Sequence, residues 1–247
     1  MNPYLATLLT FAIAIFFLRL MDFIAHRGWI ESKLSRKVIH IGTGPIFVLC
    51  WLMYPDLAVS RWLAALVPLL ITVQFALVGT GVIKDDAAVK AMSRTGDRGE
   101  ILRGPLFYGI VFVAVTLIYW KDSLVGIPAL MMMCGGDGIA DIVGRRINSP
   151  KLPWSREKSF AGSLSVFIGG WLLTMFIFAV YVWIGAFSGP ITRFLLPVTW
   201  IAPAAMYQSR IFSPTNKLIR SSFSRNDAVI RITGLPIGSF VVGSRSR

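Results

Sequence analysis

The chain has 247 residues, of which 55% are hydrophobic and only 15% charged, and its mean hydropathy is +0.67. This composition excludes an ordinary soluble domain, a disordered chain and a collagen-like chain, and it indicates a membrane protein. A net charge of +13 would suggest nucleic acid binding in a soluble protein. Basic loops account for such a charge in a membrane protein, so we expect no nucleic acid partner.

Spanning helices are expected wherever about 20 mostly apolar residues follow one another. The candidate segments, four long and three shorter or interrupted by Gly and Pro, are 3–20, 38–54, 62–83, 105–120, 124–136, 164–187 and 191–207. The first lacks the basic start and small-residue cleavage site of a secretory signal, so we expect a permanent helix. The sequence therefore predicts an all-α fold, a polytopic transmembrane helix bundle of about seven spans.

Lysine and arginine are concentrated in alternate connections between these segments. The first, third and fifth connections carry five cations each, whereas the second, fourth and sixth carry only Arg61, Lys121 and Arg193. By the positive-inside rule the odd connections face the cytoplasm or stroma. The alternation supports the count of seven spans, and we expect the active site at this interface.

Two aspartates stand in a glycine-rich apolar segment, where an acid costs about 2.5–3.5 kcal/mol to insert into a membrane. Asp137 and Asp141 are four residues apart, so on a helix their side chains leave one face. Such a pair suits Mg²⁺, which usually takes one or two protein carboxylates and otherwise water and phosphate oxygens. Nearby glycines allow close approach of a nucleotide or merely of another helix, and they include Gly136, Gly138 and Gly144.

A polar segment, 151–163, follows directly and combines cations, hydroxyls and glycine, as phosphate-binding loops do. Backbone N–H groups at the start of the next helix would add to anion binding. The candidate nucleotide contacts here and just before are Arg145, Lys151, Ser159, Gly162 and Ser163, with Lys158 as a catalytic cation. The alternative is a solvated loop in which Ser163 is the N-cap of the next helix.

Two more polar clusters, at 35–40 and 94–105, lie on the same face. In the first, Arg36 is a candidate nucleotide contact and His40 is either a proton acceptor or a hydrogen-bonded structural residue. In the second, Arg103 is a candidate nucleotide contact, although the acids there have arginines to pair with. We expect all the clusters to converge on one site where a water-soluble anion meets a lipid. P-loop, Rossmann, zincin and hydrolase-elbow motifs are absent from the sequence.

The segments 34–40, 92–105, 137–146 and 151–163 resemble the phytol kinases of plastids and cyanobacteria, within the polyprenol kinase group that includes dolichol kinase. The resemblance covers roughly residues 30–205. It implies CTP-dependent phosphorylation of a prenyl alcohol, most simply phytol, for tocopherol synthesis in a plastid membrane or a cyanobacterial one. The spacing of Asp137, Ala140 and Gly144 also resembles the CTP-binding region of dolichol kinases and CDP-diacylglycerol synthases.

On this interpretation the partners are phytol, CTP and the lipid membrane, and the cofactor is Mg²⁺ held by Asp137 and Asp141. The cationic side chains would neutralise the charge that develops during direct phosphoryl transfer. Three alternatives stay open: a farnesol or geranylgeraniol kinase, a cytidylyltransferase that makes a CDP-lipid, and a non-catalytic membrane protein that binds or transports a cation.

The last forty or so residues differ from the family pattern, which continues with a Glu-Ser-Leu-Pro-like turn and a final hydrophobic helix. We therefore expect a kinase domain at 1–207 and a basic, non-spanning tail at 208–247. Read one nucleotide later, codons for 209–213 can spell Val-Glu-Ser-Ser-Pro, which suggests a frameshift or an alternative splice. The alternative is a natural basic tail that binds anionic lipid.

Overall fold

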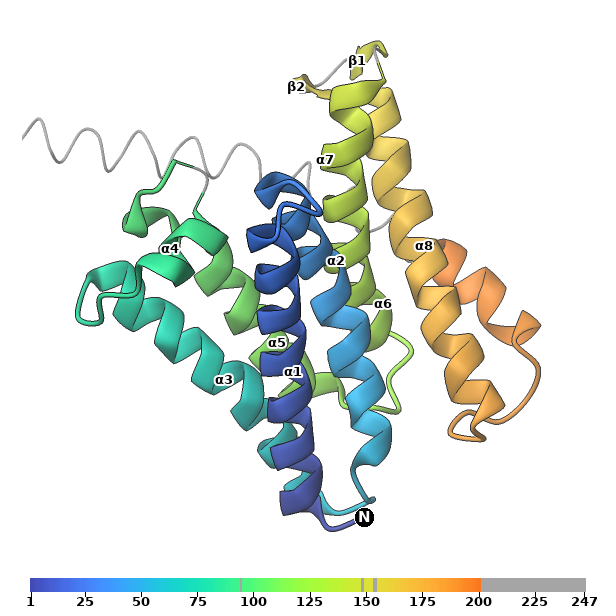
Figure 1. Cartoon of the computed structure of the whole chain (residues 1–247). Helices are drawn as coiled ribbons and strands as arrows, with labels where there is room; N and C mark the ends of the chain where they lie inside the picture. The colour runs from blue at the N-terminus through green and yellow to red at the C-terminus, as the bar shows by residue number, and fades with distance from the viewer. Residues whose placement is uncertain (94, 148, 153–154, 201–247) are drawn as a thin grey trace, which may run out of the picture. The chain divides into compact units, whose positions relative to one another are not determined.

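A computed structural model describes residues 1–93, 95–147, 149–152 and 155–200 (Figure 1). Almost all of this part of the chain is helical. The elements are α1 (Pro3–His26), α2 (Ser32–Cys50), a 3-10 turn (Trp51–Met53), α3 (Ala58–Thr80), α4 (Asp86–Met92), a second 3-10 turn (Arg98–Glu100), α5 (Gly104–Tyr119), α6 (Gly126–Met131), a π turn (Met132–Gly136), α7 (Asp137–Arg146), β1 (Lys151–Leu152), β2 (Ser155–Ser159) and α8 (Phe160–Trp183). Residues 192–200 are also helical.

The helix boundaries have local causes. Helix α1 begins with Asn2, whose side chain accepts a hydrogen bond of 2.9 Å from the N–H of Tyr4, and with a proline at its first position. Helix α3 ends at Gly81, which has φ of +83°, a conformation that glycine adopts without steric cost. Helix α5 begins with Gly104 and Pro105, where the sequence predicted a helix start.

The segment 124–136 is longer than the sequence predicted. Helix α6, the π turn and α7 follow one another without a break from Gly126 to Arg146. The acid pair therefore belongs to the same helical segment as the fifth predicted span, near its basic end. A π turn inside an α-helix adds one residue to a turn, and such turns are frequent at functional sites.

The polar segment 151–163 is not simply a loop. Strands β1 and β2 form a two-stranded antiparallel sheet in which Lys151 pairs with Ser159 and Leu152 with Ser155. Helix α8 begins at Phe160, and its N-cap is Ser159. The alternative prediction of Ser163 as the N-cap is wrong, because α8 begins one turn earlier and places Ser163 inside its first turn.

Five helical segments in the described part are long and apolar enough to cross a membrane, and α2 runs beside them as a sixth long helix. They are Pro3–His26, Ala58–Thr80, Arg98–Tyr119, Gly126–Gly144 and Phe160–Trp183. The predicted class, an all-α polytopic bundle, is confirmed. The count of seven stays a prediction, because segment 191–207 runs beyond the described residues. The predicted tail, 208–247, lies wholly outside them.

The helices of this bundle form a ring. Helix α1 packs against α2 and α3, α3 packs against α5, α5 contacts α6, and α2 contacts the π turn after α6. Helix α8 packs along α6, the π turn and α7. Several large apolar side chains are exposed to the surroundings of the bundle, as lipid-facing residues are expected to be, and they include Leu8, Phe16, Ile118 and Trp183.

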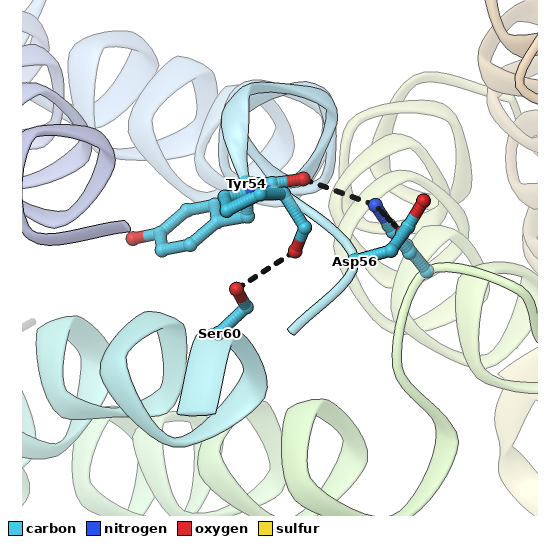
Figure 2. A network of polar contacts seen from close by, with 5 residues as sticks. Tyr54, Asp56 and Ser60 are labelled. Carbon is cyan, nitrogen blue, oxygen red and sulfur yellow. Dashed lines mark hydrogen bonds and ion pairs between the residues drawn. The ribbon is translucent and has the colours of Figure 1, made fainter. Parts of the chain in front are cut away.

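The end of the bundle that carries few cations is tied together by a small polar network (Figure 2). Lys121 donates to the carbonyl of Tyr54 at 3.0 Å and pairs with the Asp56 carboxylate at 2.5 Å. Ser60, in the first turn of α3, donates to the carbonyl of Pro55 at 2.8 Å. These contacts join the start of α3 to the connection between α5 and α6.

Candidate functional site

A cavity of about 750 Å³ lies inside the ring of helices. Its walls come from α1, α2, α3 and α5, with Met133 of the π turn. They are mostly apolar and aromatic, and they include Phe17, Ile46, Phe47, Ile71, Phe75 and Phe112. The volume lies within the range of small-molecule binding sites, and an apolar lining suits a hydrocarbon.

One end of the cavity is lined by charged and polar side chains. Arg36, Lys37 and His40 line it from α2, and Glu100 and Arg103 from the chain just before α5. All five come from connections or helix starts that the sequence assigned to the basic face. The cavity therefore joins an apolar interior to a cationic mouth.

Residues of the two sequence clusters 35–40 and 94–105 line this mouth together, Arg36 from the first and Glu100 and Arg103 from the second. The Arg36 guanidinium also donates to the carbonyl of Ser93, which directly precedes the second cluster. The convergence of all the clusters on one site stays a prediction. His40 lies beside Tyr108, with ring centroids 4.7 Å apart, and its carbonyl accepts a 2.8 Å hydrogen bond from the Tyr108 hydroxyl.

The cluster on α7 meets α2. Gly138 packs against Ile41 and His40, and further along Gly44 of α2 packs against Cys134. These two contacts show that α2 and α7 run antiparallel. Position 141 follows Gly138 by three residues on the same side of α7, so it lies about level with Lys37 on α2. The acid pair is therefore close to the cationic mouth along the helix axis.

The start of α8 lies against α7. The Ser159 hydroxyl accepts a 3.2 Å hydrogen bond from the N–H of Gly162. Gly144 and Gly162 face one another, since a methyl group added to either would lie 3.6–3.7 Å from the other's Cα. Gly136 is buried against the backbone of Val166 in α8. Gly144 and Gly162 thus bring the first turn of α8 beside the last turn of α7.

The first N–H groups of α8 already have partners. Those of Phe160, Ala161 and Gly162 donate to the Pro150 carbonyl, the Ser149 hydroxyl and the Ser159 hydroxyl, at 2.9, 3.0 and 3.2 Å. The contribution of these amides to anion binding stays a prediction.

The remaining predicted residues lie in the same region of the chain. Lys151 is exposed on β1, and Ser163 is half-buried in the first turn of α8. Asp137, Asp141 and Arg145 belong to α7 and Lys158 to β2, and their side chains lie outside the described part of the structure. Figure 1 shows α4, β1 and β2 toward the end of the bundle opposite the marked N-terminus.

Sequence reasoning missed the side chains that shape the cavity. Tyr108 and the residues of α1 and α3 carry no motif, because an apolar residue that faces a cavity looks like one that faces lipid. Glu100 stood in the charged segment 94–105 but was not singled out.

A divalent cation fits the residues of α7 by donor chemistry. Positions 137 and 141 are one turn apart on one face of a regular helix, and both carry carboxylates, the ligands that Mg²⁺ prefers. Among the side chains that the structure describes, no three His, Cys, Asp or Glu residues gather into a metal site. By donor chemistry alone, the acid pair on α7 is the candidate for Mg²⁺.

Fold and site define a multi-pass membrane protein whose apolar cavity opens at a cationic, acid-bearing interface. Comparison with known proteins agrees with the family that the sequence predicts. A protein of Triticum aestivum named "Probable phytol kinase, chloroplastic" is 43% identical over 180 residues, which are 73% of this chain and 60% of the relative. A protein of Zea mays with the same name is 44% identical over 168 residues, 68% of this chain and 55% of the relative.

A third relative is named after a different substrate, farnesol. The "Farnesol kinase, chloroplastic" of Arabidopsis thaliana is 42% identical over 176 residues, 70% of this chain and 57% of the relative. No protein-family model and no solved structure matches the chain. The resemblance to the phytol kinase family is thus confirmed by homology, and the chain spans at most about 60% of the length of these curated relatives.

Proposed function

We propose that this chain phosphorylates a prenyl alcohol, with phytol as the first substrate to test and CTP as the phosphate donor, in a plastid membrane. The observation that carries the proposal is the cavity, which is apolar inside and cationic at its mouth. Such a site can hold a long hydrocarbon while its hydroxyl stays where a water-soluble nucleotide can reach it. The names of the relatives support the substrate class and the compartment.

The donor and the metal follow from the residues of α7. The spacing of Asp137, Ala140 and Gly144 resembles that of CTP-using enzymes, which supports CTP. Asp137 and Asp141 would hold Mg²⁺, which supplies charge neutralisation on the triphosphate. A cyanobacterial membrane is the alternative compartment, and a role in tocopherol synthesis would follow if phytyl phosphate is the product.

In this mechanism the protein mainly positions the reactants and neutralises charge, because phosphoryl transfer needs little covalent help. Cationic groups from α2 and from the chain just before α5, above all Arg36 and Arg103, line the mouth where the hydroxyl would attack. Lys151 and Lys158 of the ribbon β1–β2 would neutralise the donor phosphates, as would Arg145. His40 lines the same mouth and is the candidate to accept the hydroxyl proton.

A farnesol kinase is the second candidate, because one relative carries that name. A CDP-lipid cytidylyltransferase would use the same nucleotide but would transfer its α-phosphate. A protein that only binds or transports a cation has no use for a cavity of this volume with an apolar lining. The assay below separates these three functions.

The test uses membranes that contain the full chain, with Mg²⁺, phytol and CTP labelled at the γ-phosphate. We expect labelled phytyl phosphate, and we expect Asp137→Asn to lower its formation by about 100-fold or more, since the carboxylate would hold the metal. Asp22→Asn, an exposed acid on α1, is the matched control and should leave the rate unchanged.

Three outcomes would contradict the proposal. Full activity of Asp137→Asn would show that Asp137 does not hold an essential Mg²⁺. In a parallel assay with CTP labelled at the α-phosphate, label in the lipid would indicate a cytidylyltransferase. In a parallel assay with farnesol in place of phytol, transfer to farnesol with none to phytol would favour the second candidate.

A further inference from the structure

The cavity has two unlike ends, and the distance between them follows from the length of α2 that separates them. Arg36 lines the cationic mouth and Cys50 lines the far end, and both belong to this one helix. Fourteen residues of α-helix at 1.5 Å each separate them by about 21 Å. Helix α1 passes beside this path from Leu18 to Thr10, and α3 from Phe75 to Val67.

The far end is closed by packed side chains. Thr10, Cys50 and Val67 line it and are 1%, 6% and 2% exposed. The Thr10 hydroxyl donates to the Ala6 carbonyl at 2.8 Å and accepts a 3.2 Å hydrogen bond from the Tyr54 hydroxyl. We refer to Thr10, Cys50 and Val67 as the floor of the cavity.

The floor is held in place from below. The Tyr54 hydroxyl donates a hydrogen bond to Thr10. The backbone carbonyl of Tyr54, which is drawn in Figure 2, accepts a hydrogen bond from Lys121. The hydrogen bond from Lys121 to the Tyr54 carbonyl thus joins the connection between α2 and α3 to the connection between α5 and α6. Because the floor residues are packed and hydrogen-bonded, their displacement by a longer ligand would cost free energy.

The charge distribution allows a single orientation of an amphipathic ligand. Among the residues that the structure describes, the charged ones that line the cavity are Arg36, Lys37, Glu100 and Arg103, and they are at the mouth. A hydroxyl buried near the floor would have to give up its hydrogen bonds to water in an apolar environment, which is costly. A hydrocarbon end at the mouth would in turn displace water from charged groups.

We propose that the cavity is the binding site for the hydrocarbon chain of the alcohol, and that its floor sets the longest chain the protein accepts. This inference rests on the proposed function for the class of ligand. A fully extended chain advances roughly 1.2 Å per bond, as extended polypeptide does, so about 21 Å accommodates roughly 17 bonds. A C20 isoprenoid fills this length, and one more isoprene unit exceeds it.

The test measures binding without nucleotide, so that it does not depend on catalysis. The purified full chain in lipid nanodiscs is titrated with tritiated C10, C15, C20 and C25 prenyl alcohols. Cys50→Phe fills the floor, and Ile46→Phe narrows the cavity one helical turn, about 6 Å, nearer the mouth. Ile118→Phe, at an exposed position on α5, is the matched control for added bulk.

We expect Cys50→Phe to weaken binding of the C20 alcohol by about tenfold or more while C10 binding changes less than about twofold. Ile46→Phe should weaken binding of C15 as well, because one helical turn corresponds to roughly one isoprene unit. Ile118→Phe should bind the whole series as the wild type does. Val67→Ala, which deepens the floor without adding bulk, should improve binding of the C25 alcohol.

The inference is overturned if Cys50→Phe and Ile46→Phe weaken all four alcohols equally, or if Val67→Ala leaves the C25 alcohol as weak as before. The binding series and the phosphorylation assay can fail independently. If the wild type transfers phosphate but the variants keep its chain-length preference, the role of the floor is refuted and the proposed function stands. If the variants shift the chain-length preference but no phosphate is transferred, the binding site stands and the kinase function is refuted.

Discussion

The two halves of the bundle differ in the space that their packed helices leave. Between α7 and α8, glycines bring helices into close contact, and a Cβ added at Gly136 would lie only 2.8 Å from the Val166 carbonyl oxygen. Between α1, α2, α3 and α5, large side chains such as Phe17, Phe47 and Phe75 surround a cavity of about 750 Å³. One half is filled by backbone contact, whereas the other keeps room for a ligand.

On the proposed function, this arrangement would let one membrane protein hold two unlike reactants. The closely packed half holds the positions of the acid pair and the ribbon β1–β2 on a rigid support, which suits a charged ligand that approaches from water. The open half holds an apolar volume that lipid-soluble molecules can occupy. The two halves meet where α2 contacts α7, beside His40 and Gly138.

Gly136→Ala should disturb the packing of α8 against the segment that leads into α7, and it has the largest expected effect on stability. The new methyl group would press on the Val166 backbone, which cannot move unless α8 moves. We expect a loss of about 1–3 kcal/mol, typical of overpacking. Thermal unfolding of the purified chain in detergent would measure it.

Gly144→Ala is the control for that prediction. Its added methyl group would lie 3.6 Å from the Gly162 Cα, an ordinary contact, and alanine favours helix over glycine. We therefore expect unchanged or slightly raised stability. Equal destabilisation by both substitutions would mean that helix propensity and contact distance do not explain the packing of α7 on α8.

Tyr108→Phe tests the junction between the halves and should have an intermediate effect. The Tyr108 hydroxyl, on α5, lies 2.8 Å from the His40 carbonyl and 2.9 Å from the Cys134 Sγ. Its removal should cost about 1 kcal/mol of stability, the usual net value of a hydrogen bond. Chemical or thermal unfolding would show it, with the exposed Tyr4→Phe as a control that changes nothing. Equal stability of Tyr108→Phe and the wild type would show that the junction does not depend on this hydroxyl.

Asp56→Asn should have the smallest effect. The Asp56 side chain is 89% exposed, so its ion pair with Lys121 is largely screened by water. We expect a loss below about 0.5 kcal/mol, which high salt should erase in an unfolding measurement. Lys121 would keep its bond to the Tyr54 carbonyl. A loss well above that value would show that the ion pair itself holds the closed end of the cavity.

The long helices could be predicted because each is encoded locally. Apolar runs and residues such as Pro105 indicated where helices lie, and α5 begins where that proline predicted. The N-cap of α8 was harder, since Ser155, Ser159 and Ser163 all stand at suitable distances and cap preference alone does not choose among them. The continuous run from α6 into α7 was missed because its glycines look like a break.

The membrane class, the basic face and the spacing of Asp137 and Asp141 can be read from the sequence, because these depend on residues close together in the chain. Which apolar residues face a cavity becomes known only from the folded bundle. In a bilayer, lipid and protein interior are about equally apolar, so periodicity does not distinguish a wall such as Ile46 from a lipid-facing residue such as Ile118. The cavity and its floor arise from helices that are far apart in the sequence and meet only in the folded bundle.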